Sequence, residues 1–122
     1  MPDVLRNRRI LVAEDEYLLA EQLRRQLEDL GALVVGPVAA LDQVLDLIEA
    51  EPPFDLALLD VNLRDEKVFP AVDLLVERGV PVVLATGYDA VEFPAGWTGV
   101  RWCQKPISSK ALARVVGEAL AG

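Results

Sequence analysis

The sequence predicts a doubly wound α/β fold, in which helices cover both faces of a five-stranded parallel sheet. Short runs of consecutive apolar residues, typical of strands buried on both faces, alternate with segments whose apolar residues recur at helical spacing. This alternation continues along the whole chain, which indicates parallel strands joined by helical crossovers. The chain has 122 residues, a length that suits one domain of this kind.

Three strands and two helices are predicted in the first half of the chain. The first helix should end at Gly31, a residue typical of helix C-termini, and the second at Pro52-Pro53, which cannot continue a helix. A loop is expected from the end of the third strand through Lys67. The predicted strands cover residues 9–13, 33–38 and 56–59, and the helical apolar faces are Leu19, Leu23, Leu27 and Leu30, then Leu41, Val44, Leu45 and Ile48.

The second half of the chain adds two strands and two clear helices. Pro70 suits the first turn of a helix that ends at Gly79, and Ser108 is a suitable N-cap for the last helix. The predicted strands cover residues 81–85 and 100–103.

The segment over residues 89–98 is predicted to form only a short or irregular fourth helix. Pro94 prevents a straight helix from running through it, and Gly96 disfavours a helix by about 1 kcal/mol relative to alanine. One isolated helical turn before Pro94 would not be stable without packing.

Composition excludes several classes of function. The net charge of −8 disfavours a nucleic-acid surface, and no apolar run approaches the ~20 residues that span a bilayer, so we expect neither nucleic acid nor membrane as a partner. The single cysteine, Cys103, cannot form an internal disulfide, and a reducing cytoplasm is the expected location. The chain contains no histidine, so it cannot be its own phosphohistidine donor.

Four short polar segments lie at the carboxyl ends of predicted strands. Because the carboxyl ends of parallel strands lie along one edge of the sheet, where ligands bind, these segments should converge there. They would bring together carboxylates, a hydroxyl group and an ammonium group, a set that suits a divalent metal and a phosphoryl group. The segments are Glu14-Asp15-Glu16, Asp60-Val61-Asn62, Thr86-Gly87-Tyr88 and Lys105-Pro106.

The chemistry of this set favours phosphoryl transfer to an aspartate. Glu14, Asp15 and Asp60 would be like charges in one cleft, and such clusters either take up protons or bind a cation. Carboxylate oxygens are ligands that Mg²⁺ prefers, and an aspartate neutralised by magnesium is a competent nucleophile for a phosphoryl group. The Lys105 ammonium and the Thr86 hydroxyl would then hold the phosphoryl oxygens.

Each segment alone also has an ordinary structural interpretation. The acidic residues after the first strand favour the first turn of a helix, and Asp60 could cap a helix or a turn. Thr86-Gly87 is by itself typical of a turn, and Lys105-Pro106 of a solvated loop. Trp102 is by itself more typical of packing than of a switch. The four polar segments together, in this order and at strand ends, favour the functional interpretation.

The chain resembles the receiver domain of two-component response regulators over essentially its whole length. The matching motifs are Val12-Ala13-Glu14-Asp15-Glu16, Leu59-Asp60-Val61-Asn62-Leu63, Ala85-Thr86-Gly87 and Gln104-Lys105-Pro106. The resemblance implies a flavodoxin-like sheet with strand order 2-1-3-4-5. It also implies that residues 1–122 are a single receiver domain without an output domain.

The same resemblance implies a role for each matching residue. Asp60 would be the phosphoacceptor, Thr86 the switch hydroxyl and Lys105 the lysine that pairs with the phosphoryl group. Trp102 would occupy the position of the switch aromatic residue. The metal ligands for Mg²⁺ would be Asp15, bound directly, Glu14, acting mainly through water, Asp60, and the backbone carbonyl of Asn62.

The function implied is that of a response regulator phosphorylated by a sensor histidine kinase. Such a protein would catalyse only its own aspartyl phosphorylation and dephosphorylation. It would pass the signal to a phosphotransfer protein or a downstream target protein, or act as a phosphate sink. The alternative is a degenerate receiver that binds a partner independently of phosphorylation, although the intact set of Asp15, Asp60, Thr86 and Lys105 argues against it.

A closer resemblance is carried by Pro81-Val82-Val83-Leu84-Ala85-Thr86-Gly87-Tyr88. This segment is similar to the Pro-Phe-x-Phe-Ala-Thr-Gly-Tyr signature of stand-alone alphaproteobacterial receivers, which are served by kinases of the HWE and related classes. The chain differs from that signature by having Val82 and Leu84 where phenylalanines are usual.

Overall fold

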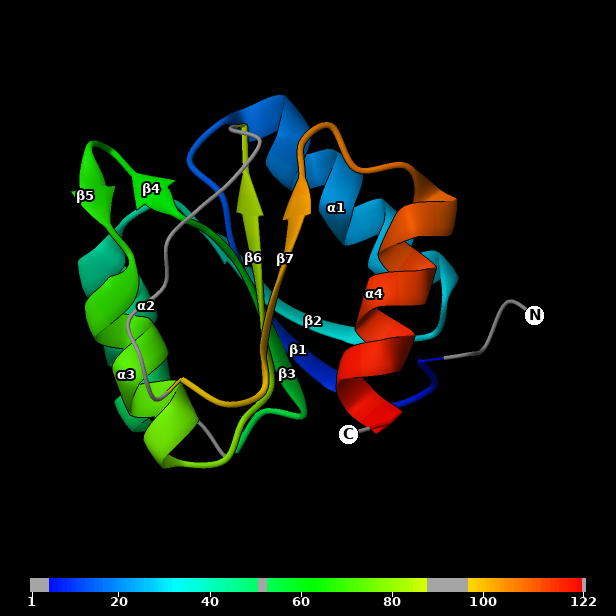
Figure 1. Cartoon of the computed structure of the whole chain (residues 1–122). Coiled ribbons are helices and arrows are strands. Elements are labelled where there is room, and N and C mark those ends of the chain that lie inside the picture. The colour runs from blue at the N-terminus through cyan, green and yellow to red at the C-terminus, as the bar shows by residue number, and fades with distance from the viewer. Residues whose placement is uncertain (1–4, 51–52, 88–96, 122) are drawn as a thin grey trace.

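A computed structural model describes residues 5–50, 53–87 and 97–121. These residues form three layers, in which one parallel sheet lies between two pairs of helices (Figure 1). The sheet has the strand order β2-β1-β3-β6-β7. Counting only its five strands along the chain, this is the predicted order 2-1-3-4-5. The strands are β1 (Arg9–Ala13), β2 (Leu33–Val38), β3 (Leu56–Asp60), β6 (Val82–Thr86) and β7 (Val100–Gln104).

Two helices cover each face of the sheet. α1 (Tyr17–Asp29) and α4 (Ser109–Ala121) lie on one face, and α2 (Leu41–Ala50) and α3 (Phe69–Glu77) lie on the other (Figure 1). The predicted short or irregular fourth helix falls almost entirely on residues 88–96, which lie outside the described residues. None of the described helices has the length and apolar character needed to cross a membrane.

Every residue of the two central strands β3 and β6 is buried, as their continuous apolar sequences predict. Because successive side chains of a strand point to opposite faces, each strand contributes to two cores. Leu59 and Leu84 pack in the core beneath α2 and α3, whereas Leu58 and Val83 pack in the core beneath α1 and α4. The sequence therefore builds the layered architecture through strands that are apolar on both faces.

The helices begin and end where local chemistry predicts. The Glu16 carboxylate caps α1 by accepting hydrogen bonds from the backbone N–H groups of Leu18 and Leu19. Ser108 Oγ accepts a bond from the N–H of Ala111 in the first turn of α4, which confirms its predicted capping role. Gly31 and Gly79 follow the C-caps of α1 and α3 with φ angles of 97° and 74°, in the left-handed region that favours glycine.

The prediction of a loop from the third strand through Lys67 was wrong in two respects. β3 includes Asp60 as its last residue, and the following residues form a small antiparallel hairpin of β4 (Asn62–Leu63) and β5 (Glu66–Lys67). Leu63 pairs with Glu66, so Arg64 and Asp65 are the two central residues of the turn. Their φ angles are 49° and 68°. No Asn-Gly or Asp-Gly pair marks this hairpin in the sequence, so its strongest local signal is missing.

Trp97 joins the segment before β7 to α3. Its indole ring packs edge-on against Phe69, with ring centroids 5.2 Å apart, and its Nε1 donates a 2.7 Å hydrogen bond to Asp73. Both partners lie on α3, so this tryptophan has the packing role that is common for the residue type.

Candidate functional site

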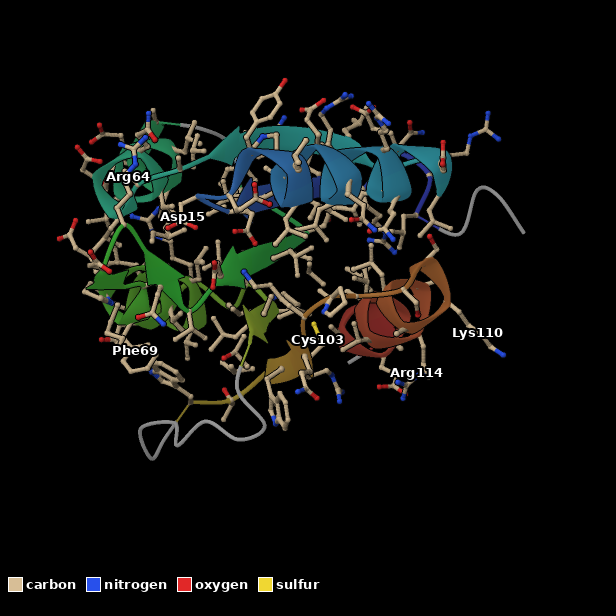
Figure 2. All side chains as sticks on the ribbon, turned by 90° about the horizontal axis from the view of Figure 1, so that it is seen from above. Asp15, Arg64, Phe69, Cys103, Lys110 and Arg114 are labelled. Atoms are coloured by element: carbon tan, nitrogen blue, oxygen red, sulfur yellow. The ribbon has the colours of Figure 1, made fainter. Side chains whose placement is uncertain are left out.

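The sheet register brings the four predicted polar segments to one edge of the molecule. Glu14 follows β1 directly, Asp60 ends β3, Thr86 ends β6 and Lys105 follows β7. Neighbouring strands are hydrogen-bonded at this edge, where Asp60 pairs with Ala85 on β6. Figure 2 looks down on the edge from above, with Asp15 labelled there. Parallel pairing therefore unites residues that are up to 91 positions apart in sequence.

The centre of the site is an ion-pair triad formed by one lysine and two carboxylates. Lys105 Nζ lies 2.9 Å from Glu14 Oε1 and 2.9 Å from Asp60 Oδ2. Glu14 is 2% exposed and Asp60 is 7% exposed, so the lysine partners two acidic groups that water barely reaches. Buried carboxylates need such a partner, because an unpaired buried charge is strongly unfavourable.

Burial and pairing shift the pKa values of this triad. Burial raises the pKa of Glu14, and its hydrogen bond to Lys105 opposes that rise. Burial lowers the pKa of Lys105, but hydrogen bonds to Asp60 and Glu14 outweigh this effect and leave that pKa raised overall. Lys105 is therefore held as a cation at neutral pH.

Asp15 differs from the other two carboxylates in being exposed at the rim of the site. Its Oδ2 accepts a 2.8 Å hydrogen bond from the backbone N–H of Arg64, in the turn between β4 and β5. Carboxylate oxygens of Glu14, Asp15 and Asp60 lie within 4.8 Å of one another. The acidic pair predicted from sequence thus lies beside the predicted phosphoacceptor.

This donor set fits a hard divalent cation. Three carboxylates close together supply the oxygen ligands that Mg²⁺ prefers, and the exposure of Asp15 leaves room for the waters that magnesium retains. Asn62, whose carbonyl is the fourth predicted ligand, begins β4 two residues after Asp60, and its N–H donates a 3.3 Å hydrogen bond to Asp60 Oδ1.

Thr86 lies next to the lysine through the backbone. Its carbonyl oxygen accepts a 2.8 Å hydrogen bond from the N–H of Lys105, and Thr86 is 2% exposed. The end of β6 and the residue after β7 are thereby held together beside Asp60.

Trp102 lies apart from this cluster. It pairs in register with Leu84, is 40% exposed, and lines a groove between β7 and α4 together with Arg114. Trp102 therefore lies on an exposed part of the edge strand β7, whereas Trp97 is partly buried against α3.

Sequence reasoning missed two features of the site. Glu16 belongs to the acidic run after β1, but its carboxylate caps α1, so the helix-terminus interpretation was right for this one residue. The Arg64 amide that bonds Asp15 carries no sequence signal, because it is a backbone group placed by the hairpin.

The geometry gives Asp60 the setting of a nucleophile for phosphoryl transfer. This carboxylate at a strand end lies beside an ammonium group and beside two further carboxylates that can hold a cation. Phosphoryl transfer depends mainly on positioning and on stabilising the charge of the transferred group, and an ammonium group and a cation are groups that can stabilise such charge.

The chain matches known proteins in both sequence and fold. Residues 10–115 match the response regulator receiver domain family. The transcriptional regulatory protein PdtaR of Mycobacterium tuberculosis is 30% identical over 109 residues, which are 86% of this chain and 53% of PdtaR. The chain therefore spans about half the length of the curated relatives it matches.

Two solved structures share both fold and sequence similarity with the chain. The crystal structure of the response regulator PhyR from Brucella abortus superposes with a TM-score of 0.81 at 27% identity, covering 98% of this chain and 51% of PhyR. The solution structure of SdrG from Sphingomonas melonis Fr1 gives a TM-score of 0.80 at 34% identity, covering 95% of this chain and 98% of SdrG. With the family match covering most of its length, this chain belongs to the response regulator receiver domain family.

Proposed function

We propose that this receiver domain accepts a phosphoryl group on Asp60 from a sensor histidine kinase, with Mg²⁺ bound by the neighbouring acidic residues. The observation that carries the proposal is the position of Lys105, which lies 2.9 Å from both Glu14 and Asp60. A lysine that joins the candidate acceptor to the candidate metal-binding pair is what charge stabilisation at this carboxylate requires.

The proposed reaction needs a donor outside this chain, since the chain contains no histidine. An oxygen of Asp60 attacks the phosphorus of a phosphohistidine. The new O–P bond forms as the P–N bond breaks, and the electron pair of that bond leaves with the imidazole nitrogen. No further reactant is required.

We propose separate roles in this reaction for Lys105, Thr86 and Trp102. Lys105 stays protonated and pairs with the phosphoryl oxygens once they stand beside Asp60. Thr86, at the adjoining strand end, offers a hydroxyl to the phosphoryl group, and we propose that Trp102 responds to this change as an aromatic switch.

The proposed metal site consists of Asp15, Glu14, Asp60 and the carbonyl of Asn62. Bound Mg²⁺ would supply positive charge that neutralises both the nucleophilic carboxylate and the incoming phosphoryl group. The close approach of the three carboxylates supports this assignment.

Phosphorylation by a small donor tests the proposal directly. The protein is incubated with acetyl phosphate with and without Mg²⁺, and its intact mass is measured. We expect one added phosphoryl group that depends on magnesium and is lost in base, as an aspartyl phosphate should be.

The matched control is Asp60→Asn, which keeps the shape of the side chain and removes the nucleophile. If the variant is phosphorylated to the same extent, the assignment of Asp60 is wrong. If the wild-type protein takes up no phosphoryl group from acetyl phosphate or from any kinase of a panel, the degenerate, phosphorylation-independent receiver is the better description.

We further propose that the chain belongs with the stand-alone alphaproteobacterial receivers and that its donors are kinases of the HWE or related classes. The segment 81–88 supports this proposal, as does the similarity to PhyR from Brucella abortus and SdrG from Sphingomonas melonis Fr1. A downstream protein or a phosphotransfer protein would be the second partner. Transfer assays with a panel of kinases would test it.

A further inference from the structure

The hairpin after β3 touches the candidate site through two backbone amides. The N–H of Asn62 donates to Asp60 Oδ1, and the N–H of Arg64 donates to Asp15 Oδ2 at 2.8 Å. Asp15 and Arg64 lie 49 positions apart in sequence and side by side in the structure (Figure 2). One short hairpin therefore contacts both the predicted phosphoacceptor and the predicted direct metal ligand.

The base of the hairpin is attached firmly to the core. Val61 and Val68 are buried, and the N–H of Val68 donates a 2.9 Å hydrogen bond to the carbonyl of Val61. Leu63 is also fully buried. The position of the turn is therefore set by core packing.

The turn itself has an unusual backbone for its sequence. Arg64 and Asp65 both have positive φ angles, as a two-residue turn of the hairpin type requires, although neither is glycine. L-residues adopt this conformation rarely, and such outliers concentrate at functional sites. In this turn the Arg64 N–H donates to Asp15 Oδ2 instead of to the surrounding water.

We propose that the β4–β5 turn is a positioning element for the metal ligand Asp15. The Arg64 amide holds Oδ2, so that the carboxylate is oriented before a cation arrives and Oδ1 is left as its metal ligand. The inference rests on the proposed function, since it assumes that Asp15 binds Mg²⁺. Groups that orient a metal ligand in this way commonly change metal affinity about 10–100-fold when they are lost.

Substitutions at Asp65 separate turn geometry from charge. Asp65→Asn and Asp65→Val both remove the carboxylate, but asparagine tolerates the left-handed region and valine does not. We expect Asp65→Asn to bind Mg²⁺ within about twofold of wild type and Asp65→Val to bind about tenfold more weakly, as measured by calorimetric titration.

A remote variant controls for general loss of stability. Asn7 also has a positive φ angle, 63°, and it lies at the opposite end of β1 from the site. Asn7→Val should destabilise the fold by a comparable strain and leave Mg²⁺ affinity unchanged. If Asp65→Val does not fold, insertion of one glycine between Arg64 and Asp65 displaces the amide without a β-branched residue, and the same loss of affinity is expected.

The hydrogen bond itself is observable without metal. In ¹⁵N-resolved NMR spectra of the metal-free protein, the Arg64 amide proton should shift upfield and exchange faster in Asp15→Ala than in wild type. The inference would be overturned, and the proposed function left standing, if the chemical shift and exchange rate of the Arg64 amide proton were unchanged in Asp15→Ala. Equal Mg²⁺ affinities for Asp65→Val and Asp65→Asn would have the same consequence. Absence of Mg²⁺ binding to the wild-type protein would overturn the proposed metal site, and the inference with it.

Discussion

Replacing Gly36 by alanine is expected to destabilise this fold far more than the same replacement at Gly79. Both glycines have positive φ angles, 102° and 74°, so both changes force alanine into the left-handed region. They differ in their surroundings. A Cβ atom at Gly36 would lie 2.7 Å from the carbonyl oxygen of Val12 and 2.9 Å from the nitrogen of Val38, whereas a Cβ atom at Gly79 would meet nothing within 4 Å.

The magnitudes follow from these distances. Left-handed backbone costs an L-residue about 1–2 kcal/mol, and the lower chain entropy of alanine in the unfolded state offsets about 0.4–1 kcal/mol of this. Gly79→Ala should therefore lose about 0–1.6 kcal/mol. At Gly36 the overlap is with two backbone atoms that cannot rotate away, and forced repacking of this kind adds about 1–3 kcal/mol. We expect Gly36→Ala to lose about 1–4.6 kcal/mol in total, which is about 1–3 kcal/mol more than Gly79→Ala.

The strain at Gly36 should also reach the site. The pairing of β1 with β2 shifts register between Leu11 and Ala13, and the N–H of Glu14 donates a 3.0 Å hydrogen bond to the carbonyl of Val38. If Val12 or Val38 shifts to relieve the overlap, Glu14 is displaced with it, since Glu14 follows β1 and is hydrogen-bonded to Val38.

Urea unfolding followed by far-ultraviolet circular dichroism measures both variants against wild type. Free energies of unfolding that fall by equal amounts in the two variants would refute the reasoning, because the close approach at Gly36 would then carry no energetic weight. A larger loss in Gly79→Ala would refute it as well.

Three further predictions concern single residues. Gly117 lies within α4 with open space around its Cα, so Gly117→Ala should raise the free energy of unfolding by about 0.5–1 kcal/mol in the same urea assay. Burial raises the pKa of the Cys103 thiol to about 11, so alkylation by iodoacetamide at pH 8 should be much slower in the native than in the urea-unfolded protein, and equal rates would contradict this. In the absence of metal, Asp15→Asn should have a higher melting temperature than wild type, because the substitution relieves repulsion with Glu14 and Asp60. The corresponding gain in the free energy of unfolding is up to about 1 kcal/mol. Magnesium should then stabilise wild type more than this variant in thermal scans, and equal stabilisation would count against Asp15 as a ligand.

The sequence by itself determined the layered fold and the composition of the site. Strands such as β3 and β6 are apolar at every position up to their ends, and only a sheet covered on both faces can bury them. Asp60 and Thr86 stand out because each ends such a strand, and the geometry of parallel sheets brings strand ends to one edge. These inferences need only local pattern and a general rule of architecture.

Tertiary structure alone decided how the site residues contact one another. That Lys105 joins Glu14 to Asp60 depends on side-chain positions across three strands, which no local pattern encodes. Glu16 and Asp15 are adjacent acidic residues, yet one caps α1 and the other faces the site, because the chain changes direction between them.

The hairpin after β3 was equally beyond sequence reasoning. Arg64 and Asp65 lack the residue types that mark such a turn, and the core packing of Val61, Leu63 and Val68 imposes the conformation on them. The group that reaches Asp15 is a backbone amide, which every residue except proline carries, so only the folded position of Arg64 distinguishes it. The chemistry of a side chain is evident from the sequence, whereas the role of a backbone amide depends on its position in the folded structure.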